Sequence, residues 1–323
     1  MDITKIEGNV VTKTMRDKIL LYHGAPGTWK TTVAVGDKET TILGAFEIGY
    51  KFIPGVKAVN LTSWAALKDL VRQLKTAEAQ EMYKTVAIDT IGLAYKACIN
   101  FICAREGVIS IGKIPYGQGY AMAKNEFEKL IHTIPQLGYG LIMIAHSDEL
   151  NDETNGVSIK VDIDKRPSSV IKGMADFILY AHKEKTDNSE KADDMSVYAY
   201  SQTKNPNIEV KSRARFFPKR VLFTYEAINE ALIKAIEDQD IFFGVESSTE
   251  ENFKIYQDTE VDLEALQKEI IILAEFLLKT PLSDRVNGVI SKHINTRVSL
   301  TTRIDIPKLY AIRDEFIDLK KGV

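Results

Sequence analysis

Cysteine is scarce in this sequence, since only Cys98 and Cys103 occur among its 323 residues. Both fall in a segment that we expect to be helical, where a buried thiol behaves as a small apolar side chain. A small domain stapled by several disulfides is excluded by this count. We therefore expect two reduced thiols and a cytoplasmic protein.

Long apolar runs are also absent. No stretch approaches the roughly 20 apolar residues that a helix needs to cross a bilayer. The start of the chain, Met1-Asp2-Ile3-Thr4-Lys5, has no apolar segment of the kind found in secretory signals. We expect no membrane partner.

An excess of one charge is missing as well. The formal net charge is −3, so a nucleic-acid site would have to be a local basic patch. Hydrophobic residues make up 45% and charged residues 27%, which is typical of a soluble globular protein. The length predicts one large domain or two ordinary ones.

What the sequence does contain is a pattern for a phosphate-binding loop. An apolar run, Ile19 to Tyr22, leads through glycines into a segment compatible with a helix. Backbone N–H groups of such a loop point inward at phosphate oxygens, and the helix start adds positive partial charge. We expect Lys30 to reach the β- and γ-phosphates of ATP and the Thr31 hydroxyl to hold Mg²⁺. The predicted nucleotide-binding residues are Gly24, Ala25, Pro26, Gly27, Thr28, Trp29, Lys30, Thr31 and Thr32.

Trp29 departs from this pattern, which has glycine at that position. Glycine alone adopts a positive φ at low cost. Two alternatives stay open: the loop takes a φ that Trp29 tolerates with its indole turned outward, or nucleotide binding is weakened. The alternative interpretation of the whole stretch is a strand, a turn and a helix that do not bind nucleotide and contain a Lys-Thr pair by chance.

Three polar side chains follow predicted buried strands. Asp89 follows the apolar run Thr85–Ile88, Glu47 follows Thr40–Phe46, and His146 follows Leu141–Ala145. Strands that alternate with helices predict a mostly parallel sheet, and ligands bind at the carboxyl ends of its strands. We expect Asp89 to complete the Mg²⁺ site with Thr31, Glu47 to polarise the attacking water, and His146 to hydrogen-bond the γ-phosphate. The competing interpretations are an ordinary strand-ending Asp, a surface Glu and a structural His.

The C-terminal part has a different character. Leu263, Leu266, Ile270, Leu273 and Leu277 follow helical spacing, so residues 261–279 are expected to form one long helix. Residues 282–294 and 306–320 predict two more, the last capped by Asp305. We therefore divide the chain into a nucleotide-binding core at 1–240, a linker at 241–260 and a helical C-terminal domain at 261–323.

With these residues in order, the chain resembles the RecA-like core P-loop ATPases. Within them it is most similar to phage-encoded Sak-type single-strand annealing ATPases. Besides the loop, the segments that carry the resemblance are Phe46–Gly49, Val86–Thr90, Tyr116-Gly117, Ile142–His146 and Lys211–Arg213. The fold class expected is α/β, a RecA-like core with a mostly parallel sheet and a small C-terminal helical appendage.

The resemblance implies that two loops face DNA, about residues 105–120 and 147–166. Basic side chains interleaved with aromatic rings suit single strands, because phosphates need cations and unstacked bases need flat faces. The alternative is two solvated polar loops, and the second loop also carries six acidic residues. The residues expected to contact DNA are Arg105, Lys113, Tyr116, Tyr120, Lys160, Lys165 and Arg166.

A basic stretch, Lys211, Arg213 and Arg215, precedes Phe216. The resemblance implies that such cations reach a neighbouring subunit's γ-phosphate, so Arg213 is an expected catalytic residue in trans, next to Glu47, Lys30 and His146 within the chain. The alternative is a basic strand edge. Head-to-tail contacts of this kind produce rings or filaments, so a homo-oligomer is expected.

These patterns together favour an ATP-binding and ATP-hydrolysing protein of phage-type DNA recombination or replication, acting in the host cytoplasm. It would bind single-stranded DNA, with Mg²⁺ as cofactor, and promote annealing or strand pairing. The expected partners are single-stranded DNA, further copies of the chain and a single-strand binding protein. Two alternatives stay open: a ring helicase or its loader, and a nucleotide-gated DNA-binding module that does not hydrolyse.

Overall fold

A mostly parallel sheet organises the larger of the two units into which the chain divides, residues 4–255. The computed structural model describes residues 11–152, 156–187, 194–248, 263–293 and 306–321. The strand order is β10-β8-β7-β1-β5-β4-β2-β3, with β6 paired to β5 and β9 to β7. The six strands from β7 to β3 are parallel to one another, which confirms the predicted α/β fold class.

The strands follow the predicted apolar runs closely near the nucleotide-binding pattern. In chain order they are β1 (Ile19–Gly24), β2 (Thr41–Ala45), β3 (Lys57–Asn60), β4 (Thr85–Asp89), β5 (Gly140–Asp152), β6 (Gly156–Val161), β7 (Phe177–Lys185), β8 (Met195–Tyr200), β9 (Lys211–Ser212) and β10 (Arg220–Leu222). β2 and β4 are buried throughout, because helices cover both faces of a parallel sheet.

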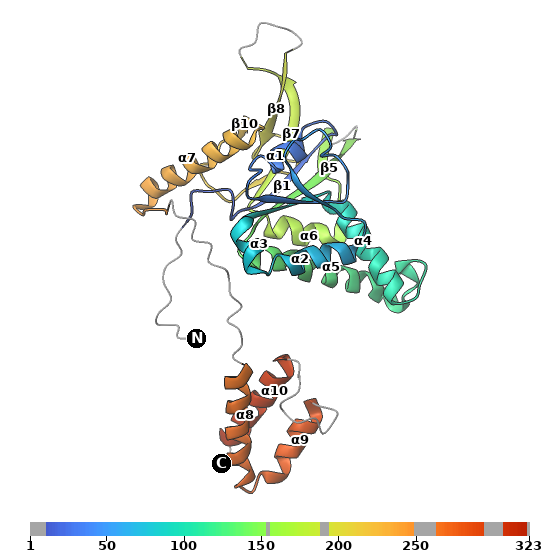
Figure 1. Cartoon of the computed structure of the whole chain (residues 1–323), viewed down its shortest axis with the longest axis vertical. Coiled ribbons are helices and arrows are strands. Elements are labelled where there is room, and N and C mark those ends of the chain that lie inside the picture. The colour runs from blue at the N-terminus through green and yellow to red at the C-terminus, as the bar shows by residue number, and fades with distance from the viewer. Residues whose placement is uncertain (1–10, 153–155, 188–193, 249–262, 294–305, 322–323) are drawn as a thin grey trace. The chain divides into compact units, whose positions relative to one another are not determined.

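The helices cover the two faces of the sheet (Figure 1). One apolar core lies between the sheet and α2, α4, α5 and α6, around Trp64 and Phe127, and the other lies between the sheet and α1 and α7, around Tyr22 and Phe223. The helices of this unit are α1 (Lys30–Ala34), α2 (Trp64–Gln73), α3 (Ala77–Met82), α4 (Ile91–Arg105), α5 (Gln118–Gln136), α6 (Lys165–Met174) and α7 (Tyr225–Phe243), with short 3₁₀ turns η2 (Ile111–Lys113) and η3 (Pro115–Gly117).

Two predicted segments differ from the structure. The loop expected after His146 is instead a hairpin: β5 continues to Asp152 and pairs with β6, so His146 lies within a strand at the point where it leaves the sheet. The polar composition of Asp148–Arg166 concealed these strands because they lie outside the apolar core. The helix α7 was not expected, and it continues past residue 240 to Phe243. Beyond it, Ser248 N–H donates to the carbonyl oxygen of Val11 at 2.9 Å.

The second unit, within residues 256–323, is helical. Its helices are α8 (Leu263–Leu278), α9 (Ser283–His293) and α10 (Ile306–Lys321). Their apolar side chains enclose a separate small core that contains Ile270, Leu277 and Phe316. The C-terminal helices are thus present as predicted, while the expected cap Asp305 lies outside the described residues. No described helix is long and apolar enough to cross a membrane.

Candidate functional site

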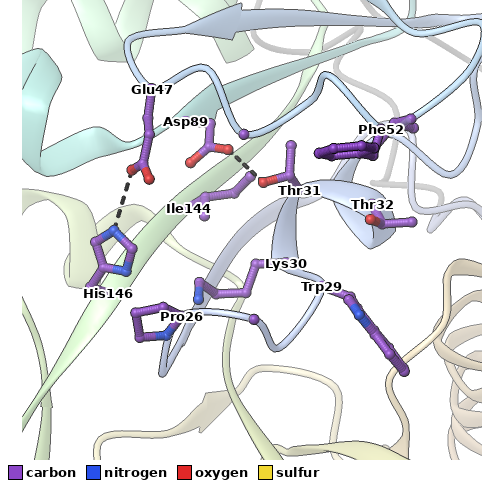
Figure 2. A pocket seen from close by; sticks show the side chains of 13 residues that line it. Pro26, Trp29, Lys30, Thr31, Thr32, Glu47, Phe52, Asp89, Ile144 and His146 are labelled. Atoms are coloured by element: carbon purple, nitrogen blue, oxygen red, sulfur yellow. Dashed lines mark hydrogen bonds and ion pairs between the residues drawn. The ribbon is translucent and has the colours of Figure 1, made fainter.

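The predicted loop lies where expected, between β1 and α1, at the carboxyl ends of the central strands. Sheet register brings the predicted residues to one level, because Gly24 is opposite His146, and Asp89 is opposite both Ala45 and Ile144. A cavity of about 440 Å³ opens there. Its lining includes Pro26, Gly27, Trp29, Lys30, Thr31, Thr32, Glu47, Asp89 and His146 (Figure 2).

Lys30 is held inside the loop. Its ammonium donates to the carbonyl oxygens of Gly24 and Ala25, both at 2.9 Å, and only 6% of the residue is exposed. Burial lowers the pKa of Lys30, while the carboxylates of Asp89 and Glu47 act in the opposite direction. The ammonium is therefore positioned at the pocket, with its hydrogen bonds to the loop available for exchange with an anionic ligand.

Thr31 and Asp89 form the predicted metal pair. The Thr31 hydroxyl donates to Asp89 Oδ2 at 2.6 Å (Figure 2). Burial raises the pKa of Asp89, and the hydrogen bond from Thr31 acts against this. Gly49 leaves space beside the pair, because an added Cβ would lie 3.6 Å from Thr31 Oγ1 and 3.8 Å from Asp89 Oδ2.

Hydroxyl and carboxylate oxygens are the donors that Mg²⁺ prefers, and Mg²⁺ in nucleotide sites takes its remaining ligands from water and phosphate. Among the described residues, no group of three or more His, Cys, Asp or Glu could hold a metal without such help. The donor set therefore fits a Mg²⁺ that arrives with a phosphate chain. Bound there, the ion would neutralise phosphate charge.

Glu47 and His146 meet at the opposite wall of the cavity. Glu47 Oε2 lies 3.3 Å from His146 Nε2 (Figure 2). The backbone N–H groups of Phe46 and Glu47 both donate to the carbonyl oxygen of Asp89, at 2.6 and 3.0 Å, which fixes the turn that carries Glu47. His146 Nδ1 is buried and has no hydrogen-bond partner. The pair can orient a water molecule or respond to a phosphate, as acid–base chemistry there would require.

Trp29 has the outward indole of the first alternative, but its backbone keeps the left-handed conformation that favours glycine. Its φ of 57° and ψ of 25° are left-handed, and 57% of the residue is exposed. Figure 2 shows the indole directed away from Lys30 and Thr31. The loop therefore reaches its turn with a Trp in the position of glycine, at a backbone cost of about 1–2 kcal/mol.

Phe52 is a pocket residue that the sequence patterns missed. It lines the cavity and is 97% exposed, so its ring is available to a flat ligand group (Figure 2). Ile53 lies beside it in the lining. The only indication of Phe52 in the sequence is that an aromatic residue follows Glu47 closely. No spacing rule relates such a residue to the phosphate-binding loop.

Arg213 does not line the nucleotide cavity of its own chain. It forms an ion pair with Asp176 at 2.8 Å and donates to the carbonyl oxygen of Gly173 at 2.7 Å. Lys211 donates to the carbonyl oxygens of Lys172 and Gly173. Both cations thus meet the C-terminal end of α6, where cations are favoured.

The basic stretch therefore meets an anion inside the chain, Asp176, and does not form one row of three cations. The strand ends at Ser212, and the Arg215 guanidinium lies 4.8 Å from the Phe242 ring instead of continuing the same row. Asp176 precedes β7, at the end of the sheet opposite the loop. The in-trans role of Arg213 stays a prediction.

The residues expected to contact DNA fall into two groups that the structure partly joins. The Arg166 guanidinium lies 3.6 Å from the Tyr120 ring centroid, so the two predicted segments touch. Arg166 also pairs with Asp164, and Arg105 with Glu106. Tyr116 is 97% exposed at the tip between α4 and α5, whereas Lys160 and Lys165 lie on β6 and at the start of α6. Contact of these residues with DNA stays a prediction.

The comparisons with known proteins agree with this site. The AAA domain family model matches residues 16–231, which cover two thirds of the chain and every residue of the pocket. The chain belongs to the AAA domain family. It is therefore a P-loop ATPase by family, and ATP with Mg²⁺ is the cofactor pair that the family implies.

A relative over the full length is also known. The chain is 28% identical to the SPbeta prophage-derived uncharacterized protein YorG of Bacillus subtilis (strain 168), over 99% of this chain and 98% of that protein. The similarity therefore extends past the matched domain into the C-terminal helices.

Proposed function

We propose that this AAA-domain protein hydrolyses ATP in phage-type DNA recombination or replication, binds single-stranded DNA, and promotes annealing or strand pairing. The observation that carries the hydrolytic part is the Glu47–His146 pair on the wall of the cavity that holds Lys30 and the Thr31–Asp89 pair. A carboxylate positioned across from a phosphate-binding lysine can act as general base on water.

Each residue has one role in this proposal. Lys30 neutralises the phosphate chain, and Thr31 with Asp89 holds Mg²⁺. Glu47 orients the attacking water, His146 holds Glu47, and the exposed Phe52 ring offers a stacking face to the base. The outward indole of Trp29 leaves the loop open to nucleotide, which both the ATPase and the alternative of a module that only binds nucleotide require.

The DNA part rests on a relative and on exposed side chains. The prophage origin of the full-length relative is compatible with a phage DNA-processing role. The contact between Tyr120 and Arg166 and the exposed Tyr116 provide aromatic and cationic groups of the kind that single strands use. We include a homo-oligomer in the proposal because AAA-type and RecA-like sites are expected to work between subunits. A single-strand binding protein remains a proposed partner.

The test is the ATPase rate with and without single-stranded DNA, beside a strand-annealing assay and a measurement of particle size. Lys30→Ala should abolish tight ATP binding and hydrolysis, because its ammonium is the charge inside the loop. The control is Lys75→Ala, which removes an exposed lysine just beyond α2. Unchanged ATP affinity in Lys30→Ala would contradict the site. ATP hydrolysis without annealing or stimulation by DNA would support the ATPase site and contradict the DNA role. Directional unwinding of a forked duplex would favour the helicase alternative.

A further inference from the structure

A second cavity, of about 630 Å³, lies away from the nucleotide site. It is larger than the cavity at the loop, so its volume does not restrict it to small ions. Strands β7, β8 and β10 line one side, and residues from β6 and the segment 202–208 line the other. We call it the hairpin pocket; its lining is Ile159, Tyr180, His182, Glu184, Tyr200, Gln202, Thr203, Lys204, Asn205, Ile208, Lys219 and Arg220.

Aromatic rings gather on one face of the β7–β8 pair. Tyr180 is opposite Tyr200, and His182 is opposite Tyr198, so all four side chains share that face. His182 stacks on Tyr180 with 5.6 Å between ring centroids, and Tyr180 lies 6.4 Å from Tyr200. Tyr180 is buried, whereas His182 is exposed and Tyr200 half-buried. The rings of His182 and Tyr200 are therefore the ones available to a flat ligand group.

The charges around these rings are not balanced within the described residues. Arg220 forms ion pairs with Glu184 at 2.6 Å and with Asp187 at 2.6 Å, so both carboxylates have a cationic partner. Lys204 and Lys219 are exposed and form no ion pair with another described residue. The pocket thus keeps two cations at its edge for an anion from outside.

Amide and hydroxyl groups complete the lining. Gln202 is exposed, and Thr203 and Asn205 are half-buried beside it. The Asn205 side-chain amide donates to the carbonyl oxygen of Val157 at 2.8 Å, which ties this segment to the β5–β6 hairpin. A nucleobase requires flat faces for its ring, an amide for its polar edge and cations for its phosphate, and this pocket offers its exposed rings, the exposed Gln202 amide and two lysines.

We propose that the hairpin pocket binds a nucleotide unit of single-stranded DNA, with the base against Tyr200 and His182 and the phosphates at Lys204 and Lys219. This inference rests on the proposed binding of single strands and gives that binding a place outside the segments expected from the sequence. A nucleotide unit could come from a strand or from a free mononucleotide, and the pocket's chemistry is the same for both.

The packing also connects this pocket to the nucleotide site. Tyr180 packs against the buried ring of His23 at 5.3 Å, and His23 Nδ1 accepts from the Ser147 hydroxyl at 2.9 Å. Ser147 follows His146, the partner of Glu47. Contiguous packed contacts of this kind can carry coupling between two sites, which requires a functional measurement to establish.

The first experiment measures binding of a fluorescently labelled oligothymidylate to the full chain by anisotropy. Lys204→Ala combined with Lys219→Ala should weaken binding by about tenfold or more, and should lower the slope of log affinity against log salt by about 1.4, which is about 0.7 for each lost phosphate contact on a single strand. The matched control is Lys183→Ala with Lys185→Ala. This control also removes two positive charges, but from the face of β7 that points away from the pocket. Lys183 is opposite Val197, which is buried in the core between the sheet and α1 and α7.

Equal affinity in the two double variants would overturn the inference. Thermal unfolding and ATP binding of each variant show whether the fold and the nucleotide site are retained. If the parent binds ATP but no oligonucleotide, the DNA part of the proposed function is wrong. The proposal that the hairpin pocket binds single-stranded DNA is then wrong as well. If the parent binds the oligonucleotide and the Lys204/Lys219 variant does so equally well, only the hairpin pocket is wrong.

The second experiment separates stacking from charge. Tyr200→Phe keeps the ring and should retain affinity, whereas Tyr200→Ala should weaken it between about 5- and 100-fold, the usual range for loss of one base–aromatic stack. Equal affinity of these two variants would contradict a stacked base. Thymidine monophosphate distinguishes the sources: displacement of the oligonucleotide by comparable concentrations of the mononucleotide would overturn the assignment to a strand, and failure to displace it would support that assignment.

Discussion

Glu47 Oε2 lies 3.3 Å from His146 Nε2, and both residues line the nucleotide cavity and a neighbouring cavity of about 430 Å³. The two side chains come from distant parts of the chain, Glu47 from the turn after β2 and His146 from within β5, and β4 lies between these two strands in the sheet. They therefore form a shared wall between the nucleotide and the side of the sheet where β5 continues into its hairpin.

Glu47→Gln should keep ATP affinity and slow hydrolysis by about 10²–10⁴, the usual cost of losing a general base. The amide fills the same space but cannot take a proton from water. Steady-state phosphate release and nucleotide titration measure the two properties separately. The control is Glu81→Gln, the same chemical change on the exposed end of α3. Parental hydrolysis in Glu47→Gln would make Glu47 structural. Non-additive losses in a double variant with His146→Ala would show that the pair works as a unit.

Trp29 allows a test of backbone strain. Because its φ is 57°, Trp29→Gly should be more stable than Trp29→Ala by about 1 kcal/mol. At an ordinary helical position the order is the reverse, with alanine more stable than glycine by about 0.5–1 kcal/mol. Denaturant unfolding of the two variants measures the sign directly. An alanine variant that is the more stable would mean that the loop is not left-handed at residue 29 in solution.

His23 predicts a dependence of stability on pH. Burial lowers its pKa from 6.5 to about 4. The unfolded chain therefore binds a proton between these values that the folded chain does not, and the free energy of unfolding falls as the pH drops from about 6.5 towards 4. A shift of this size corresponds to about 3 kcal/mol. Its neutral form matches the structure, where Nε2 donates to the Glu209 carbonyl at 2.7 Å and Nδ1 accepts from Ser147.

The measurement is denaturant unfolding at several pH values for the parent and for His23→Gln, whose amide does not titrate. The parent should lose stability more steeply than the variant over this interval. Carboxyl groups with a depressed pKa in the folded chain also lose their contribution as the pH falls towards and below 4, and Asp37 is one of them, because Thr40 and Arg16 lower its pKa despite burial. Only the difference between the two curves belongs to His23. Parallel curves would reject its role.

The division into two units predicts where the chain can be shortened. A chain that ends at residue 255 should fold cooperatively, because the second unit has its own core. A chain that ends at residue 240 should be less stable, since it removes the last turn of α7 and the backbone hydrogen bonds of Ser248 with Val11 and Lys13. Calorimetry of both chains checks the order. Insolubility of the longer product would show that the C-terminal unit is needed by the first.

Local patterns predicted much of the nucleotide site. The loop, Asp89 and their strands were evident because a buried parallel strand gives an apolar run and the chemistry follows immediately after it. Glu47 and His146 were found by the same reasoning, although β2 ends two residues before Glu47. The pairing of Glu47 with His146 could not be predicted, because it depends on the order of strands in the sheet.

Other features left weak signals. The hairpin of β5 and β6 carries polar side chains, so its composition resembles a loop. The pairing of Arg213 with Asp176 left no local signal, because the two residues are 37 positions apart in sequence and meet only in the fold. The lining of the hairpin pocket comes from four separate segments, and no spacing within one segment indicates it.

The left-handed, outward-facing Trp29 also gives the protein an optical property. The chain has two tryptophans, and the other, Trp64, is fully buried, with its indole N–H donating to Glu126 at 3.1 Å. Trp64 is buried outside the cavity lining, so its emission should stay constant, whereas Trp29 lies at the rim of the nucleotide cavity and is exposed to water. Nucleotide binding should therefore change the native fluorescence of the protein through Trp29, without any attached dye.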